Sequence, residues 1–203
     1  MDDGRLCTPV SCILLFFLIV GLVGLCYVFK TQEIDCKNDI EQLKLELQLE
    51  LVERNVSIPT FQPIVSDWVY KNSSHISKKM SQEIVINIFK TNDPLFLLAL
   101  IKTESTFDPT SISSKGASGL GQVMPEHKKR LIDAGILKEF KDIFDIQTGV
   151  KATEFMWDLH LKEQKGNVVK ALTKYLGKKN DTYINQVLSD FDILRKMVKG
   201  VKK

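Results

Sequence analysis

The pattern of apolar and polar positions divides the chain into three parts. Residues 10–29 form a run of 20 positions without a charge, residues 31–55 are charged and lack glycine and proline, and helical spacing dominates from residue 76 onward. A helix rises about 1.5 Å per residue, so 20 residues can cross a hydrocarbon layer of about 30 Å. The pattern predicts a single membrane anchor, a stalk and a mainly α-helical domain.

A cleaved signal peptide is the main alternative to the anchor. The apolar run is longer than the roughly 7–15 residues of a signal-peptide core, and no small-x-small cleavage site precedes Lys30, so an uncleaved anchor is preferred. A lipid attached at Cys26 is a further alternative, but Leu25 directly before it is larger than such a site requires. Positive charges are nearly balanced on the two sides of the run, so charge alone does not orient the anchor.

The stalk has two possible periodicities. Ile40, Leu43, Leu47 and Leu51 lie on one helical stripe, while the leucines from 43 to 51 also alternate as in a strand, and the helical reading is preferred. Residues 56–76, which contain two prolines, are expected to be a linker. The expected organisation is an N-terminal segment at 1–9, the anchor at 10–29, stalk and linker at 30–75, the main domain at 76–195 and a basic tail at 196–203.

One apolar helix carries a single carboxylate to the edge of a loop rich in glycine and serine. Asp93 followed by Pro94 is a strong helix start, and Pro109 requires the helix to end close to Glu104. Apolar neighbours desolvate a carboxylate, and a helix C-terminus carries partial negative charge, so both raise its pKa. We expect Glu104 to be protonated near neutral pH, as an acid that cleaves an acetal must be.

The run ESTFDPTSISSKGASGLGQVMP, residues 104–125, resembles the signature of the lytic transglycosylase domain related to goose-type lysozyme. Weaker similarity extends over roughly residues 75–190, where Tyr175 matches a tyrosine of the family but Leu176 replaces its asparagine. The resemblance implies a lysozyme-like α-helical fold and cleavage of peptidoglycan between N-acetylmuramic acid and N-acetylglucosamine, with formation of 1,6-anhydromuramic acid. It also orients the predicted anchor in the cytoplasmic membrane: a peptidoglycan enzyme must face the periplasm or wall, which places residues 1–9 in the cytoplasm.

The resemblance implies a role for each matching residue. Glu104 is the catalytic acid and then the base, and the expected substrate-binding residues are Ser113, Gly116, Gln122, Met124 and Tyr175. By the resemblance, the hydroxyl of Tyr175 lies near the glutamate. Asp93, Asp108 and Glu126 are better read as capping or solvated groups than as a second catalytic carboxylate. A lone acid suffices when the 2-acetamido group of the sugar assists.

Composition narrows the remaining possibilities. All four cysteines precede residue 37 and no histidines have zinc spacing, so we expect neither a metal nor a cofactor. The net charge is only +3, which does not favour nucleic acid. A hydrolytic muramidase and a non-catalytic peptidoglycan-binding scaffold remain alternatives. The anchor is compatible with service to an envelope-spanning assembly, and the basic tail is expected to be solvated.

Overall fold

The computed structural model describes residues 58–73 and 75–200, which belong to one compact unit, Ser57–Lys203. The predicted anchor, the stalk and the last three residues of the basic tail lie outside the described residues. No helix within the described ranges is both long enough and apolar enough to cross a bilayer. The described part is built from helices, and its only β-type pairing is two isolated bridges.

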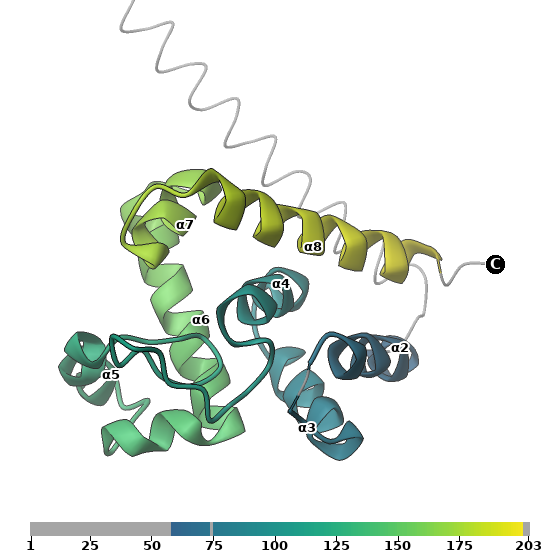
Figure 1. The fold of residues 1–203 in the computed structure, drawn as a ribbon, viewed down its shortest axis with the longest axis horizontal. Coiled ribbons are helices and arrows are strands. Elements are labelled where there is room, and N and C mark those ends of the chain that lie inside the picture. Colours follow the sequence, from purple (N-terminus) through teal and green to yellow (C-terminus); the bar gives the residue numbers. More distant parts are fainter. Residues whose placement is uncertain (1–57, 74, 201–203) are drawn as a thin grey trace, which may run out of the picture. The chain divides into compact units, whose positions relative to one another are not determined.

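The helices follow one another along the chain with short connections, apart from the long loop 106–124 between α4 and η1 (Figure 1). They are α2 (Ile58–Lys71), α3 (Lys78–Ile88), α4 (Pro94–Ser105), η1 (Pro125–His127), α5 (Lys128–Asp133), η2 (Phe140–Phe144), α6 (Ile146–Glu163), α7 (Val168–Leu176) and α8 (Asp181–Gly200). The mainly α-helical fold predicted from the sequence is confirmed.

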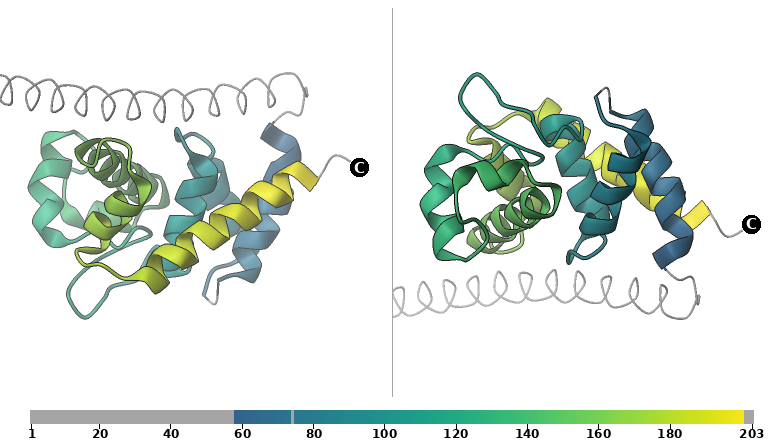
Figure 2. Two further views of the ribbon diagram at one scale, coloured as in Figure 1. Left: turned by 90° about the horizontal axis from the view of Figure 1, so that it is seen from above. Right: turned by 90° about the horizontal axis from the view of Figure 1, so that it is seen from below.

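Helix α4 lies at the centre of the domain because it carries apolar side chains on nearly every face, and all of them must be buried. Its residues from Phe96 to Ile101 are all buried, α8 runs across it, and α3 and α6 also contact it (Figures 1 and 2). Burying five large apolar side chains in one helix stabilises the domain strongly, at roughly 1.5–3 kcal/mol for each. Because α4 spans Pro94–Ser105, the predicted helix from Pro94 to the vicinity of Glu104 is confirmed.

The segment expected to be a linker is instead partly a helix of the domain. Phe61, Val65 and Val69 are spaced by four residues and are buried, and their helix α2 packs against α3. Pro63 lies inside α2 with its ring exposed. The gain from burying this stripe outweighs the backbone hydrogen bond that proline cannot make. Helix α8 likewise continues past the expected domain end at residue 195 to Gly200.

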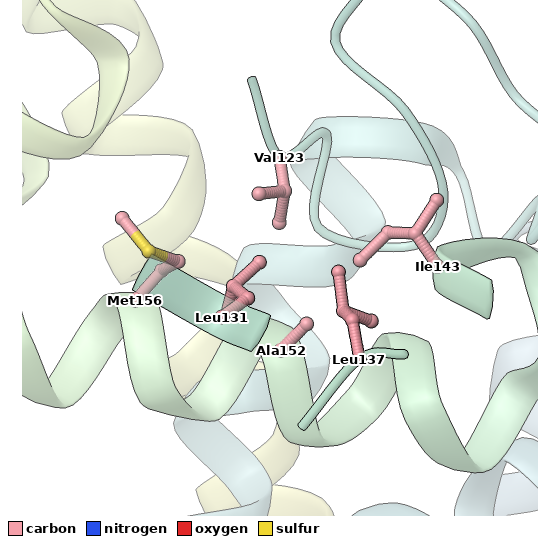
Figure 3. Packing of buried hydrophobic residues seen from close by; sticks show 6 residues of the cluster. All are labelled: Val123, Leu131, Leu137, Ile143, Ala152 and Met156. Carbon is pink, nitrogen blue, oxygen red and sulfur yellow. The ribbon is translucent and has the colours of Figure 1, made fainter. Parts of the chain in front are cut away.

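A second core supports the long loop that follows α4. It is formed by Val123 from the loop, Leu131 and Leu137 from α5 and the turn after it, Ile143 from η2, and Ala152 and Met156 from α6 (Figure 3). All six are at most 3% exposed. The loop is thus packed on helices from one side, which gives an irregular backbone a fixed support.

Candidate active site

Glu104 lies in the last turn of α4, where the helix is stopped by backbone conformation. Asp93 caps the first turn by accepting a hydrogen bond from the amide of Phe96, at 3.4 Å. At the other end, Thr106 and Phe107 both adopt left-handed conformations, with φ of 50° and 65°. Such residues are uncommon outside glycine, but Phe107 is fully buried against the edge of Trp68, which holds the turn in place.

The surroundings of Glu104 act on its pKa in opposite directions. Burial disfavours the carboxylate and raises the pKa of Glu104 from 4.5 to about 7, while a hydrogen bond from the Tyr183 hydroxyl to Oε1 partly offsets this rise. Burial is the larger cause. The pKa therefore moves in the direction that the sequence predicted, and Glu104 is poised between its acid and base forms near neutral pH.

Tyr183 was not identified from the sequence. It lies in the first turn of α8, 79 residues after Glu104, and burial together with the charge of Glu104 raises the pKa of its phenol. Tyr183 shares a helical stripe with the buried Ile184 and Val187. A tyrosine on the apolar stripe of a helix needs a partner for its hydroxyl, and this was the signal available in the sequence.

Ser113 and Gly116 close a tight turn in the loop that follows α4. The Ser113 hydroxyl accepts a hydrogen bond from the Ala117 amide at 3.0 Å, and the Gly116 amide donates to the Ser113 carbonyl at 2.9 Å. Gly116 has φ of +84°, a conformation that a side chain would strain. Bridges from Ser118 to Ile112 and to Val123 then fold the loop back on itself.

Gln122 is also engaged within the loop. Its Nε2 donates to the carbonyl of Ser111 at 3.1 Å and to the carbonyl of Gly119 at 3.0 Å, so both amide hydrogens are used. Its backbone has φ of 47°, which these two bonds help to hold. Of the side-chain amide, Oε1 is the atom that could accept a further hydrogen bond. Met124, half-buried, follows at the residue before η1.

Tyr175 holds the loop rather than the glutamate. Its hydroxyl donates to the Gly121 carbonyl at 2.7 Å. Burial raises the pKa of the Tyr175 phenol well above its ordinary value, and the charge of nearby Glu104 adds to this rise. The resemblance placed this hydroxyl near Glu104, which agrees with the structure, but the direct hydrogen bond to the carboxylate comes from Tyr183.

The other candidate carboxylates are used elsewhere. Asp93 caps α4, Asp108 accepts hydrogen bonds from the amide and hydroxyl of Thr110, and Glu126 is exposed. The pKa of Glu104 is set by burial and Tyr183, without a second carboxylate. Within the described ranges, no three His, Cys, Asp or Glu side chains are grouped so that they could hold a metal ion. The arrangement can thus transfer a proton at one carboxyl group beside a glycine-rich loop.

Comparison with known proteins identifies the domain. Residues 88–185 match the family model of the Transglycosylase SLT domain, while no curated protein matches the chain. The matched segment is just under half of the chain and runs from the end of α3 to the first turns of α8, so it includes Glu104, the loop, Tyr175 and Tyr183. Residues 88–185 are therefore a transglycosylase SLT domain, which implies lytic transglycosylase-type cleavage of peptidoglycan.

Proposed function

We propose that this chain cleaves the β-1,4 bond between N-acetylmuramic acid and N-acetylglucosamine and releases a 1,6-anhydromuramic acid end. Glu104 acts first as the acid and then as the base. The observation that carries the proposal is a single carboxyl group with a pKa of about 7. Burial raises this pKa, and the hydrogen bond from the Tyr183 hydroxyl lowers it by a smaller amount. An acid–base group works best when its pKa is near the working pH, because both of its forms are then accessible.

In the first step the protonated Glu104 gives its proton to the bridging oxygen as the bond to C1 of the muramic acid breaks. The electron pair leaves with the N-acetylglucosamine oxygen, and positive charge develops at C1. The 2-acetamido group of the muramic acid stabilises this centre in the substrate-assisted route. This route fits a site in which Asp93 caps α4, Asp108 holds the turn at Thr110 and Glu126 is exposed.

In the second step the ionised Glu104 takes the proton from the C6 hydroxyl, whose oxygen bonds to C1. The hydrogen bond from Tyr183 favours the carboxylate form, so it stabilises Glu104 between the two steps. The proton balance closes without water, because the proton lost to the leaving group is regained from C6. A muramidase would differ only in that water attacks C1.

Substrate binding is proposed for the loop residues Ser113, Gly116, Gln122 and Met124, with Tyr175 as the support of the loop. The geometry supports an indirect role for most of the polar side chains, because Ser113 and Gln122 already hydrogen-bond to backbone groups of the loop. Gly116 permits the φ of +84° that the turn requires, and a Cβ there would lie 3.4 Å from the Pro125 ring. Ser113, Gly116 and Gln122 thus fix the shape of the surface that a glycan strand would meet.

We propose further that residues 10–29 anchor the enzyme in the cytoplasmic membrane with the domain on the periplasmic side, where peptidoglycan is found. The uncharged run of 20 residues supports this proposal. The full-length protein should stay with membranes through an alkaline wash, and deletion of residues 1–29 should release it. Release of the full-length protein by the wash would contradict an uncleaved anchor.

The test of the activity is digestion of purified peptidoglycan with the full-length protein, followed by mass spectrometry of the products. The proposal predicts anhydro ends, whereas hydrolysis would give reducing ends. Glu104→Gln should retain binding to peptidoglycan but lose cleavage by at least 10²- to 10⁴-fold, the typical contribution of general acid–base catalysis. Unchanged cleavage by this variant would exclude Glu104 as the acid.

A further inference from the structure

A buried ion pair joins the helix of the proposed acid to α8, away from the glutamate itself. Lys102 Nζ lies 2.5 Å from Asp190 Oδ1, and the side chains are 20% and 2% exposed. The other carboxylate oxygen of Asp190 accepts a hydrogen bond from Gln186 at 2.8 Å, and Lys102 Nζ lies 5.3 Å from the ring centre of Trp68. Both charges are thus held in place by further contacts.

This pair differs from the other lysine–carboxylate pairs of the described residues. In each of the others both side chains are more than half exposed. Exposed pairs add little to stability, and the cost of desolvating a buried pair can cancel its Coulomb attraction. A buried pair is therefore better explained by the geometry it imposes than by the stability it adds. Asp190 also lies beyond the segment that matches the family model, which ends at residue 185.

The ion pair and the Tyr183–Glu104 hydrogen bond together can fix how far α8 is shifted along its helix axis relative to α4. Lys102 and Glu104 are two residues apart on α4, which places them about 200° apart around the helix, so they leave α4 on opposite sides. Their partners Asp190 and Tyr183 are seven residues apart on α8, which places them on the same face about 10 Å apart. Helix α8 crosses α4 (Figure 1), and the two polar contacts leave α4 on opposite sides.

The rest of the contact between α8 and α4 is mostly apolar. Ile184 and Val187, which lie between Tyr183 and Asp190, are buried, and just beyond Asp190 the rings of Phe191 and Phe96 pack edge to face with their centres 5.5 Å apart. Apolar contacts are non-directional and tolerate small shifts along a helix, whereas a hydrogen bond weakens steeply once its geometry is lost. A shift of α8 along its axis would lengthen and misalign the hydrogen bond from the Tyr183 hydroxyl and so weaken it.

We propose that Lys102 and Asp190 are positioning residues, which fix α8 so that the Tyr183 hydroxyl stays on Glu104. This proposal rests on the proposed role of Glu104 in catalysis. Tyr183 from α8 is the titratable group that acts on the pKa of Glu104, whereas Tyr175 from α7 is itself acted on by the charge of Glu104. The hydrogen bond from Tyr183 lowers the pKa of Glu104, so loss of the pair should raise that pKa.

The test is titration of Glu104 in the full-length protein, purified in detergent, by NMR of its labelled side-chain carboxyl carbon. The resonance is assigned by its absence from Glu104→Gln. The double variant Lys102→Met, Asp190→Leu replaces both charges with apolar groups, so no charge is left buried and unpaired. We expect the midpoint of Glu104 to rise by about one pH unit, a roughly tenfold weaker acid.

A double-mutant cycle that combines the Lys102/Asp190 variant with Tyr183→Phe separates a positioning role of the pair from a general effect on the fold. Tyr183→Phe alone should raise the midpoint by a similar amount, and the double variant should add no further rise in that background, because it acts through the same hydroxyl. Lys102→Arg keeps the cation and should keep the wild-type midpoint. Additive shifts, or a wild-type midpoint in a folded double variant, would overturn the proposal.

Asp192→Asn is the matched control on the same helix. It breaks the exposed pair between Asp192 and Lys196, which are 2.6 Å apart, and should leave the midpoint unchanged. A shift as large as that of the double variant would overturn the proposal. If the double variant fails to fold, Lys102→Met, Asp190→Asn applies the same test, because it removes both charges and the lysine donor but keeps the shape of the Asp190 side chain and its bond partner Gln186.

The titration needs no substrate, so it tests the positioning role separately from the proposed activity. Failure of the wild-type protein to cleave peptidoglycan would defeat the activity and leave the titration result standing. If the wild-type protein cleaves, the upper pH limit of kcat/KM should move together with the midpoint of Glu104 in each variant. A loss of kcat without this movement would indicate a structural role only.

Discussion

The two sides of the candidate site are built in different ways. On the helical side, Glu104 and Tyr183 come from α4 and α8 and meet through a side-chain hydrogen bond across 79 residues. On the loop side, residues 111–123 are shaped by their own backbone bonds, by the Gln122 amide and by the Tyr175 hydroxyl on Gly121. The helical side therefore sets the proton chemistry, and the loop sets the shape of the surface.

On the helical side, burial of Glu104 should make the stability of the folded protein depend on pH. Because folding raises the pKa of Glu104 from 4.5 to about 7, the folded protein binds more protons than the unfolded chain between these values. Its stability should therefore fall as pH rises through this window. Glu104→Gln lacks this loss and should be more stable by on the order of 2–3 kcal/mol above pH 7, with no gain below about pH 4.5.

Urea denaturation at several pH values measures this difference. Both proteins carry a neutral side chain at low pH, so the measurement at pH 4 is the internal control. A constant difference between the two proteins across the range would contradict the raised pKa.

The loop side should be most sensitive at Gly121. A Cβ there would lie 2.2 Å from Thr153 Oγ1 and 2.6 Å from its Cγ2, in the interior of α6. Gly121→Ala should destabilise the protein by roughly 1–3 kcal/mol and reduce cleavage, because the loop must move away from the helix. Thermal unfolding and peptidoglycan digestion measure the two effects.

A second substitution sharpens this prediction. Thr153→Ala removes the two closest atoms and should restore part of the stability in the Gly121→Ala background. If the double variant is no more stable than the sum of the two single effects, the clash with Thr153 is not the cause.

The two tyrosines give a matched comparison of the two sides. Tyr183→Phe removes a hydrogen bond that favours the carboxylate, so the pKa of Glu104 should rise by about one unit and the upper limit of the pH–rate profile should rise with it. Tyr175→Phe removes a bond to the loop carbonyl of Gly121 and should cost about 1 kcal/mol of stability without a comparable shift of the profile. Equal shifts in the two variants would remove the distinction between the two sides.

The smallest effect is expected at Gln122, where backbone strain and hydrogen bonding oppose each other. Gln122→Ala loses both bonds from Nε2 and keeps φ of 47°, whereas Gln122→Gly also relieves the strained conformation. The glycine variant should be the more stable of the two by roughly 0.5–1 kcal/mol, as measured by thermal unfolding. The reverse order would show that the conformation at residue 122 is not strained.

The sequence by itself determined the features that depend on near neighbours. The start of α4 at Asp93 and Pro94, its end after Glu104, the apolar surroundings of that glutamate and the glycine-rich loop all follow from residues a few positions apart. The spacing in residues 104–125 was also enough to indicate the domain that the family model matches. Caps, turns and helical stripes are local, so they can be read from the chain.

Only the tertiary structure decided which distant groups meet. In the folded domain Tyr183 contacts Glu104, Asp190 contacts Lys102, and the Tyr175 hydroxyl binds the loop. Helix α2 is part of the domain, although its prolines indicated a linker. These contacts depend on how α8 crosses α4 and on how apolar stripes pack. Packing is non-directional and involves residues far apart in sequence, so local patterns do not specify the partner of a given hydroxyl or carboxylate.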